Sequence, residues 1–186
     1  SATCVIGMSP YDTCTHWTMF GQIVILVLFQ IGGLGIMTFM SMFAVFLHKK
    51  IGLQERILLV QEAGNIRLNG VIKLLKKIFI GTFLFEGIGA IILTVAFYEE
   101  MGLKKSIYYG IFHSVSAFCN AGFDIFGEVS SSGSLVMFQS DPLVLLTLSA
   151  LVIIGGLGFL VWQDVLLTRR FKKMTVYTRL VLLATV

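Results

Sequence analysis

The chain has 186 residues, of which 56% are hydrophobic and only 13% are charged. Soluble domains carry about 25% charged residues, so this composition excludes an ordinary soluble domain. The formal net charge of +4 does not indicate nucleic acid as a partner, because twelve of the fourteen basic residues fall in two stretches, 49–77 and 169–179. Basic loops that alternate with loops lacking Lys and Arg are typical of a multi-pass protein of the cell membrane, with the basic stretches in the cytoplasm. The lipid bilayer is therefore the first expected partner.

Residues 1–50 are predicted to form a short non-helical strip and one inner helix. The helix is expected over about 19–48, because Phe20–Leu47 has no charged side chain and exceeds the roughly 20 residues that cross the hydrocarbon core. A Gly-Gly-Leu-Gly cluster at 32–35 does not follow a strand, so it indicates close helix contact or local bending rather than phosphate binding. Residues 51–71 mix charged and apolar side chains and are expected to form a cytoplasmic helical linker.

Residues 72–170 are predicted to form a complete unit of four parts. These are an outer helix over about 72–98, a half-length helix over about 105–118, a strip at Cys119–Gly122 and an inner helix over about 142–168. The uncharged run that contains the half-length helix, Ile107–Phe123, is too short for a comfortable span, so this helix is predicted to be re-entrant. Residues 171–186 are expected to be a cytoplasmic linker and the start of a third unit.

Two segments of the sequence are repeated. Ser1–Met8 aligns with Ser116–Phe123 at Ser, Ala, Cys and Gly, with an offset of 115 residues. Ile31–Gly35 is identical to Ile154–Gly158, with an offset of 123 residues, and extra residues in the loop after Asp124 account for the difference. The expected fold class is therefore an all-α membrane protein built from repeated units that run in the same direction.

The repeated strips are the candidate functional site. Non-helical backbone at membrane depth is tolerated where it lines a water-filled cavity, and its carbonyl oxygens can replace the hydration shell of a cation. Gly7 and Gly122 fit this role because glycine adopts backbone angles closed to other residues, although each could simply allow close helix packing. One strip reaches only part of an ion's shell, so a closed filter needs more strips. The first strip stands at the start of the sequence, which favours further repeats of the same protein over copies of this chain.

The string Asn120–Asp124 after the half-length helix, together with Gly21-Gln22 and Gln30–Gly35, resembles the Trk/Ktr/HKT superfamily of potassium transporters. The similarity covers essentially the whole chain and points in particular to the membrane subunit of bacterial Ktr-type, sodium-dependent potassium uptake systems. The resemblance implies a potassium-channel-like fold of four outer helix, pore helix, filter and inner helix units around one pore, of which about two are present. It implies potassium binding by the filter residues Val5, Ile6, Gly7, Asn120, Ala121 and Gly122.

The resemblance also implies partners and ions. Members of the superfamily form homodimers and bind a cytoplasmic nucleotide-binding regulatory subunit that controls opening. The remaining repeats of the same protein would complete the pore. Potassium is the transported ion, sodium is a candidate coupling ion, and no cofactor is expected. One filter glycine per unit implies looser selection than in tetrameric potassium channels.

Two acidic residues are candidates for supporting roles. Glu86 lies in the middle of the outer helix, where a bare charge costs about 2.5–3.5 kcal/mol. It is expected to face protein and to brace the half-length helix near His113 or Ser114, with direct ion binding as the alternative. Asp124 follows the second strip on the outer side, either as a solvated loop acid or as a vestibule charge that raises the local cation concentration.

Catalytic and metal sites are not expected. The sequence shows no Ser-His-Asp, Cys-His or paired-carboxylate pattern, its histidines lack ligand spacing, and three cysteines give no disulfide framework. Two other function classes stay open: a secondary transporter of another family, whose broken helices bind an organic substrate, and a non-transporting membrane scaffold. Inverted repeats are common in secondary transporters of that kind, whereas these repeats run in the same direction. A non-transporting scaffold needs no repeated half-helix and strip.

Overall fold

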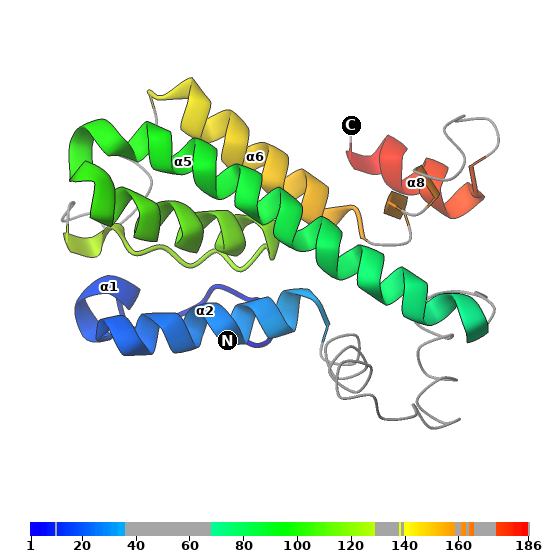
Figure 1. The fold of residues 1–186 in the computed structure, drawn as a ribbon, viewed down its shortest axis with the longest axis horizontal. Coiled ribbons are helices and arrows are strands. Elements are labelled where there is room, and N and C mark those ends of the chain that lie inside the picture. The colour runs from blue at the N-terminus through cyan, green and yellow to red at the C-terminus, as the bar shows by residue number, and fades with distance from the viewer. Residues whose placement is uncertain are drawn as a thin grey trace. The chain divides into compact units, whose positions relative to one another are not determined.

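The described part of the chain is helical in the computed structural model (Figure 1). The structure describes residues 1–9, 11–35, 68–128, 138, 140–158, 161–162, 164–165 and 174–185. Its elements are α1 (Thr13–His16), α2 (Met19–Gly33), α5 (Leu68–Phe118), the short 3-10 turn η1 (Phe126–Glu128), α6 (Pro142–Gly156) and α8 (Val176–Thr185). These residues include no strand, which agrees with the predicted all-α class.

The chain divides into two compact units. The first contains Ser1–Gly35 and Thr82–Gly155, and it holds both strips. The second contains Ile36–Gly81 and Gly156–Val186. Most of the predicted linker over 51–71, the loop over 129–137 and the basic residues at 169–173 lie outside the described residues.

In the second unit, Thr175 precedes helix α8. Its hydroxyl oxygen accepts a hydrogen bond from the Thr178 N–H at 3.3 Å, which is the usual way to satisfy an unpaired amide at a helix start. The Thr175 N–H and hydroxyl both donate to Asp164 Oδ2 at 2.8 Å. The beginning of α8 is therefore tied to the helical residues 164–165.

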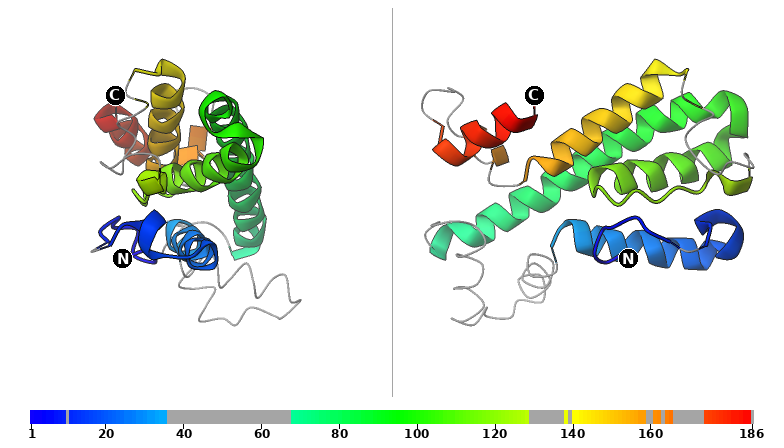
Figure 2. Two further views of the ribbon diagram at one scale, coloured as in Figure 1. Left: turned by 90° about the vertical axis from the view of Figure 1, so that its left-hand side faces the viewer. Right: turned by 180° about the vertical axis from the view of Figure 1, so that it is seen from behind.

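α5 consists of two helices that join at Gly102, which has φ 72° and ψ 163°. A helix cannot continue through these angles, and the chain reverses direction within α5 (Figure 2). The predicted outer helix (72–98) and half-length helix (105–118) lie on the two sides of this residue. Within the described residues, Lys76–Phe118 is the one stretch of helix long and apolar enough by itself to cross a membrane.

The two arms of α5 pack closely because small residues face each other. A side chain added at Gly110 would stand 2.5 Å from Thr94 Oγ1 and 2.9 Å from the Ala90 carbonyl oxygen. Four residues further on, the Ser114 hydroxyl donates a 2.7 Å hydrogen bond to the Glu86 carbonyl oxygen. The half-length helix therefore lies antiparallel against the outer helix, with backbone-to-backbone proximity that only glycine permits.

Both inner helices end earlier than the sequence predicted. Helices were expected over 19–48 and 142–168, but α2 ends at Gly33 and α6 ends at Gly156. Gly35 and Gly158 each have φ 80°, so the Gly-Gly-Leu-Gly clusters interrupt the helices instead of only bending them. Residues 36–67 lie outside the described part, whereas 161–162 and 164–165 are helical again beyond the second break.

An aromatic core holds the half-length helix in place. The buried ring of His113 stacks on Phe126 of η1 at 4.3 Å, and Phe97 of the outer arm meets Phe126 edge-on at 5.4 Å. Phe29 of α2 packs edge-on against Phe112 at 5.5 Å and stacks on Phe123, just after the second strip, at 6.0 Å. These rings fix α2, the half-length helix and the chain after the second strip relative to one another.

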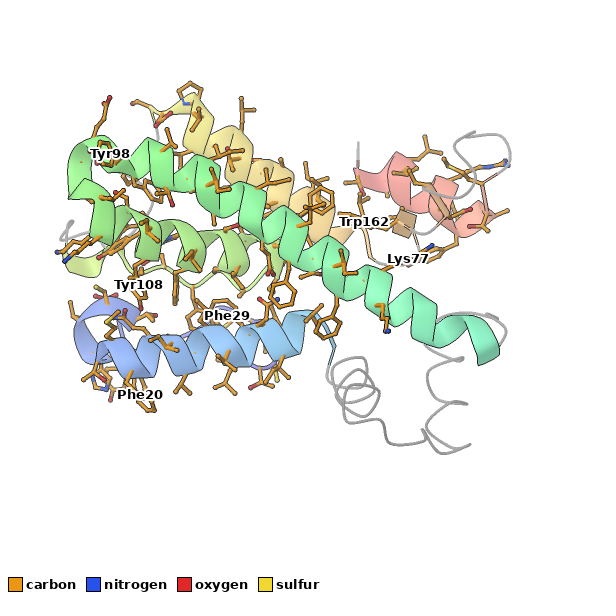
Figure 3. The ribbon with its side chains drawn as sticks, viewed as in Figure 1. Phe20, Phe29, Lys77, Tyr98, Tyr108 and Trp162 are labelled. Carbon is orange, nitrogen blue, oxygen red and sulfur yellow. The ribbon has the colours of Figure 1, made fainter. Side chains whose placement is uncertain are left out.

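The outward faces of the helices carry large apolar side chains. Phe20 of α2 is 76% exposed and Leu146 of α6 is 71% exposed. Figure 3 shows Phe20 pointing away from the rest of the first unit, whereas Phe29 on the same helix points toward α5. Such exposure is unfavourable in water and is normal for helices that contact lipid or further protein.

Candidate functional site

The two strips have the same backbone conformation. Val5 and Asn120, at equivalent positions, have φ of 54° and 56°, and Gly7 and Gly122 have φ of 72° and 71°. Left-handed angles are rare outside glycine, and for a β-branched residue such as Val5 they are an outlier. The repeat seen in the sequence is therefore matched by a repeated backbone shape.

The amide and carbonyl groups of the strips are used differently. Two N–H groups in each strip turn back to the residues before it. These bonds run from Val5 to Ala2 (3.1 Å), from Ile6 to Ser1 (3.3 Å), from Asn120 to Ala117 (3.0 Å) and from Ala121 to Ser116 (2.8 Å). In the part of the chain that the structure describes, no donor hydrogen-bonds to the carbonyl oxygens of Val5, Ile6, Gly7, Asn120, Ala121 or Gly122. Unpaired carbonyl oxygens are what a cation requires.

The structure brings the two strips together at their glycines. A side chain at Gly7 would stand 2.5 Å from the Ala121 carbonyl oxygen and 3.4 Å from the Gly122 Cα. A side chain at Gly122 would stand 3.8 Å from the Gly7 Cα, which is ordinary contact. Ile6 is 58% exposed, and Asn120 and Gly122 are also exposed, whereas Ala121 is buried. The strips thus meet at one point and keep an open side.

The Gly-Gly-Leu-Gly clusters position the strips. A side chain at Gly32 would collide with the Thr3 carbonyl oxygen, and one at Gly155 would collide with the Phe118 carbonyl oxygen. Thr3 and Phe118 occupy equivalent positions immediately before the cysteine of each strip. The close contact predicted for these clusters is thus observed, and each inner helix supports the backbone that leads into a strip.

Glu86 contacts the half-length helix through its backbone and α2 through its carboxylate. Its side chain is 4% exposed, and Gln30 Nε2 of α2 donates to both carboxylate oxygens, at 2.9 Å and 3.2 Å. Ser114 bonds the Glu86 backbone carbonyl and not the carboxylate, and His113 Nδ1 lies 2.8 Å from the Tyr109 carbonyl oxygen. Glu86 therefore faces protein and lies beside Ser114 of the half-length helix, as expected, but the partner of its carboxylate is Gln30.

Two glutamines of α2 are site residues that the sequence reasoning missed. Besides the Gln30 bond to Glu86, the Tyr108 hydroxyl donates to Gln22 Oε1 at 2.7 Å, and Gln22 Nε2 donates to carbonyl oxygens at the end of α1, including that of Trp17 at 3.2 Å. Figure 3 shows Tyr108 on the half-length helix directed toward α2. The available signal was a pair of amides in an otherwise apolar run, since a buried polar side chain needs a partner.

Two carboxylates, those of Asp12 and Asp124, follow the strips closely in the sequence. Asp12 caps α1 by accepting hydrogen bonds from the Cys14 N–H and the Thr15 hydroxyl. Asp124 is half-buried, and burial raises the pKa of its carboxyl; a hydrogen bond from the Phe126 N–H opposes this shift, and the nearby Asp12 carboxylate adds to it. The described residues contain no group of three or more His, Cys, Asp or Glu that could hold a metal ion.

Comparisons with known proteins give one family. Residues 1–182 match the TrkH family, described as cation transport protein. The chain is 41% identical over 185 residues to the potassium/sodium uptake protein NtpJ of Enterococcus hirae. It is 41% identical over 185 residues to the Ktr system potassium uptake protein B of Bacillus subtilis and 38% identical over 189 residues to that of Vibrio alginolyticus. Each alignment covers 100% of this chain and 40% of the relative, so the chain spans about 40% of the length of these curated relatives.

Proposed function

The chain belongs to the TrkH family of cation transport proteins, and on that premise we propose that its two strips contribute to a filter of backbone carbonyls through which potassium crosses the membrane. The membership identifies a membrane protein that acts in cation transport, which points away from an enzyme. The proposal adds the residues and the mechanism.

One observation carries the proposal. Two strips with nearly equal left-handed angles bond their N–H groups to the residues before them and approach each other at Gly7 and Gly122, and within the described residues their carbonyl oxygens accept no hydrogen bond. A potassium ion loses its hydration shell on entering a filter, and several carbonyl dipoles must replace it. The carbonyl oxygens of Val5, Ile6 and Gly7, and of Asn120, Ala121 and Gly122, are the ligands that we propose.

The wider assembly follows from the same proposal. The equal backbone of the two strips supports repeated outer helix, re-entrant pore helix, filter and inner helix units in a multi-pass protein. Two strips do not enclose an ion, so we assign the rest of the shell to further repeats of the same protein. The names of the relatives support potassium as the ion and sodium as a second ion.

The relatives also bear on partners. The relatives from Bacillus subtilis and Vibrio alginolyticus are both named as parts of a Ktr system, which supports a membrane subunit of a system with several components. We propose a cytoplasmic nucleotide-binding regulatory subunit that gates the pore, and a homodimer as the membrane assembly. Asp124 is the proposed vestibule residue, because its carboxylate follows the second strip.

The test is a serine at Gly122 in the full-length protein. Gly122 has φ 71°, which a serine adopts only with strain, so the strip must shift and its carbonyl oxygens must move. We expect potassium uptake by transport-deficient cells to lose discrimination against sodium. Gly102→Ser is the matched control, because Gly102 has φ 72° but lies in an open turn with nothing within 4 Å. Equal discrimination in Gly122→Ser and the unaltered protein would refute the filter.

A further inference from the structure

A polar pair, the buried Glu86 and the half-buried Gln30, lies beside the start of the second strip. Gln30 comes from the last turn of α2, and Glu86 comes from the outer arm of α5. The Gln30 amide donates to both Glu86 oxygens, and the Cys119 thiol lies 3.8 Å from Gln30 Oε1 and 3.9 Å from Glu86 Oε1. Cys119 is the first residue after the half-length helix, so the pair touches the point where the second strip begins.

The same helix end supports the first strip. Gly32, two residues after Gln30, packs against the Thr3 carbonyl oxygen, and a side chain at Gly33 would stand 2.5 Å from Cys119 Sγ. One turn of α2 therefore contacts the approach to the first strip on one side and the start of the second strip on the other. The Gln30–Glu86 hydrogen bonds join these two contacts into one unit.

The pair is specific to this junction. The offset of 123 residues places Leu145 and Ile153 of α6 at the positions of Gln22 and Gln30. Both are exposed and apolar, so the second inner helix has no amide to offer at these positions. An amide at the position of Gln30 is therefore not a requirement of every inner helix. Gln30 is explained instead by the Glu86 carboxylate, which needs a hydrogen-bond donor.

Resting on the filter proposed above, we propose that Gln30 and Glu86 are a positioning pair that sets the spacing between the first and second strips and thereby the preference of the pore for potassium over sodium. Neither side chain contacts the ion. The amide holds the carboxylate through both of its oxygens, which fixes the rotation of α2 against the outer arm of α5. Since the strips meet at Gly7 and Gly122, a shift of α2 changes the separation of their carbonyl oxygens.

The experiment measures potassium and sodium fluxes of the full-length protein in liposomes. Gln30→Leu removes the donor and leaves a buried carboxylate unpaired, and Glu86→Leu removes the acceptor. We expect each to lower the potassium-to-sodium flux ratio by up to about tenfold, which is less than the full loss of one hydrogen bond to a charged group, because only part of a positioning contact reaches the ion. The exchanged double variant Gln30→Glu/Glu86→Gln rebuilds an amide–carboxylate pair and should restore the ratio. Thr147→Val is the control, because among the described residues the Thr147 hydroxyl bonds the Leu143 carbonyl of its own helix, α6.

The outcomes separate this inference from the filter itself. If Gly122→Ser changes the ratio but both leucine variants keep it, the positioning pair is refuted and the filter stands. An exchanged variant no better than the leucine variants also refutes the pair. A variant too unstable for flux measurements is tested in detergent instead, by comparing how well potassium and sodium protect the protein against heat. An unaltered preference for potassium over sodium contradicts the inference, and a weaker preference supports it.

Discussion

Three glycines with nearly the same left-handed φ offer a controlled test of the strip geometry. Gly7, Gly102 and Gly122 have φ of 72°, 72° and 71°. Alanine at Gly7 or Gly122 therefore meets a backbone penalty of about 1–2 kcal/mol for an L-residue held at left-handed angles. Gly102 also has ψ 163°, a conformation essentially confined to glycine, so alanine there meets its own penalty of about 1–3 kcal/mol. The surroundings differ, because an added Cβ meets nothing within 4 Å at Gly102, ordinary contact at Gly122 and a backbone oxygen at 2.5 Å at Gly7.

The collision at Gly7 should lower the stability of a Gly7→Ala protein further. The atom in the way is the Ala121 carbonyl oxygen, which cannot rotate aside as a flexible side chain would. Overpacking of this kind typically costs about 1–3 kcal/mol, so we expect a total of about 2–5 kcal/mol for Gly7→Ala. Gly122→Ala should stay near the backbone penalty alone, because its added Cβ meets only ordinary contact. The structure thus predicts a larger destabilisation for Gly7→Ala than for Gly122→Ala, its equivalent in the second strip.

The assay combines stability with selectivity in the full-length protein. Thermal unfolding in detergent should rank Gly7→Ala below Gly122→Ala, and flux ratios of potassium to sodium should fall for both of these variants but not for Gly102→Ala. Two results would refute the reasoning. One is a Gly7→Ala protein as stable as Gly122→Ala, because the strips then do not touch at Gly7. The other is a Gly102→Ala protein with the same loss of selectivity, because strain anywhere would then suffice.

Three further predictions concern the surroundings of the strips. Gly155→Ala should destabilise the protein by about 1–3 kcal/mol, since its Cβ would collide with the Phe118 carbonyl oxygen, whereas Gly87→Ala has open space and should stabilise its helix by up to about 1 kcal/mol; equal melting temperatures would contradict this. Val5→Asn should raise the melting temperature by relieving a left-handed β-branched residue, and a lower value would show that the strip needs the valine side chain. Asp124→Asn should slow potassium uptake at about 0.01 M salt but not above about 0.1 M, where screening is stronger. Because burial raises the pKa of Asp124, uptake by the unaltered protein at low salt should also decline as the pH falls, and the Asn variant should lack that part of the decline.

The candidate filter could be predicted because repetition exposes it. Secondary-structure propensity says little about so short a segment, but the aligned copies Ser1–Met8 and Ser116–Phe123 share Ser, Ala, Cys and Gly. These shared residues identify the positions under the same constraint. The left-handed angles at Gly7 and Gly122 are that constraint, and glycine is the residue that meets it without strain. The division of α5 at Gly102 was also predictable in outline, from charged residues between two apolar runs.

Contacts between distant segments could not be predicted in the same way. The apolar run over 19–48 favours one continuous helix, and its Gly-Gly-Leu-Gly cluster predicts close contact or bending but not that α2 ends at Gly33. At that end the Thr3 carbonyl oxygen lies against Gly32, which is a tertiary contact that the sequence does not specify. Likewise, the sequence requires a partner for Glu86 but does not select Gln30 over nearer polar residues, because the two are 56 positions apart.

The two strips share a backbone but are not held equally. The second strip begins at Cys119, which packs against Gly33 and lies beside the Gln30–Glu86 pair. At the first left-handed position of the first strip stands Val5, a poor residue for that conformation, where the second has Asn120, a good one. A strip that stores strain yields more readily when a neighbour moves, so the first strip should adapt to the ion while the second fixes the geometry. If the strips form the proposed filter, we expect equivalent substitutions in the two strips to have unequal effects, with selectivity depending most on the second strip, which the Gln30–Glu86 pair supports.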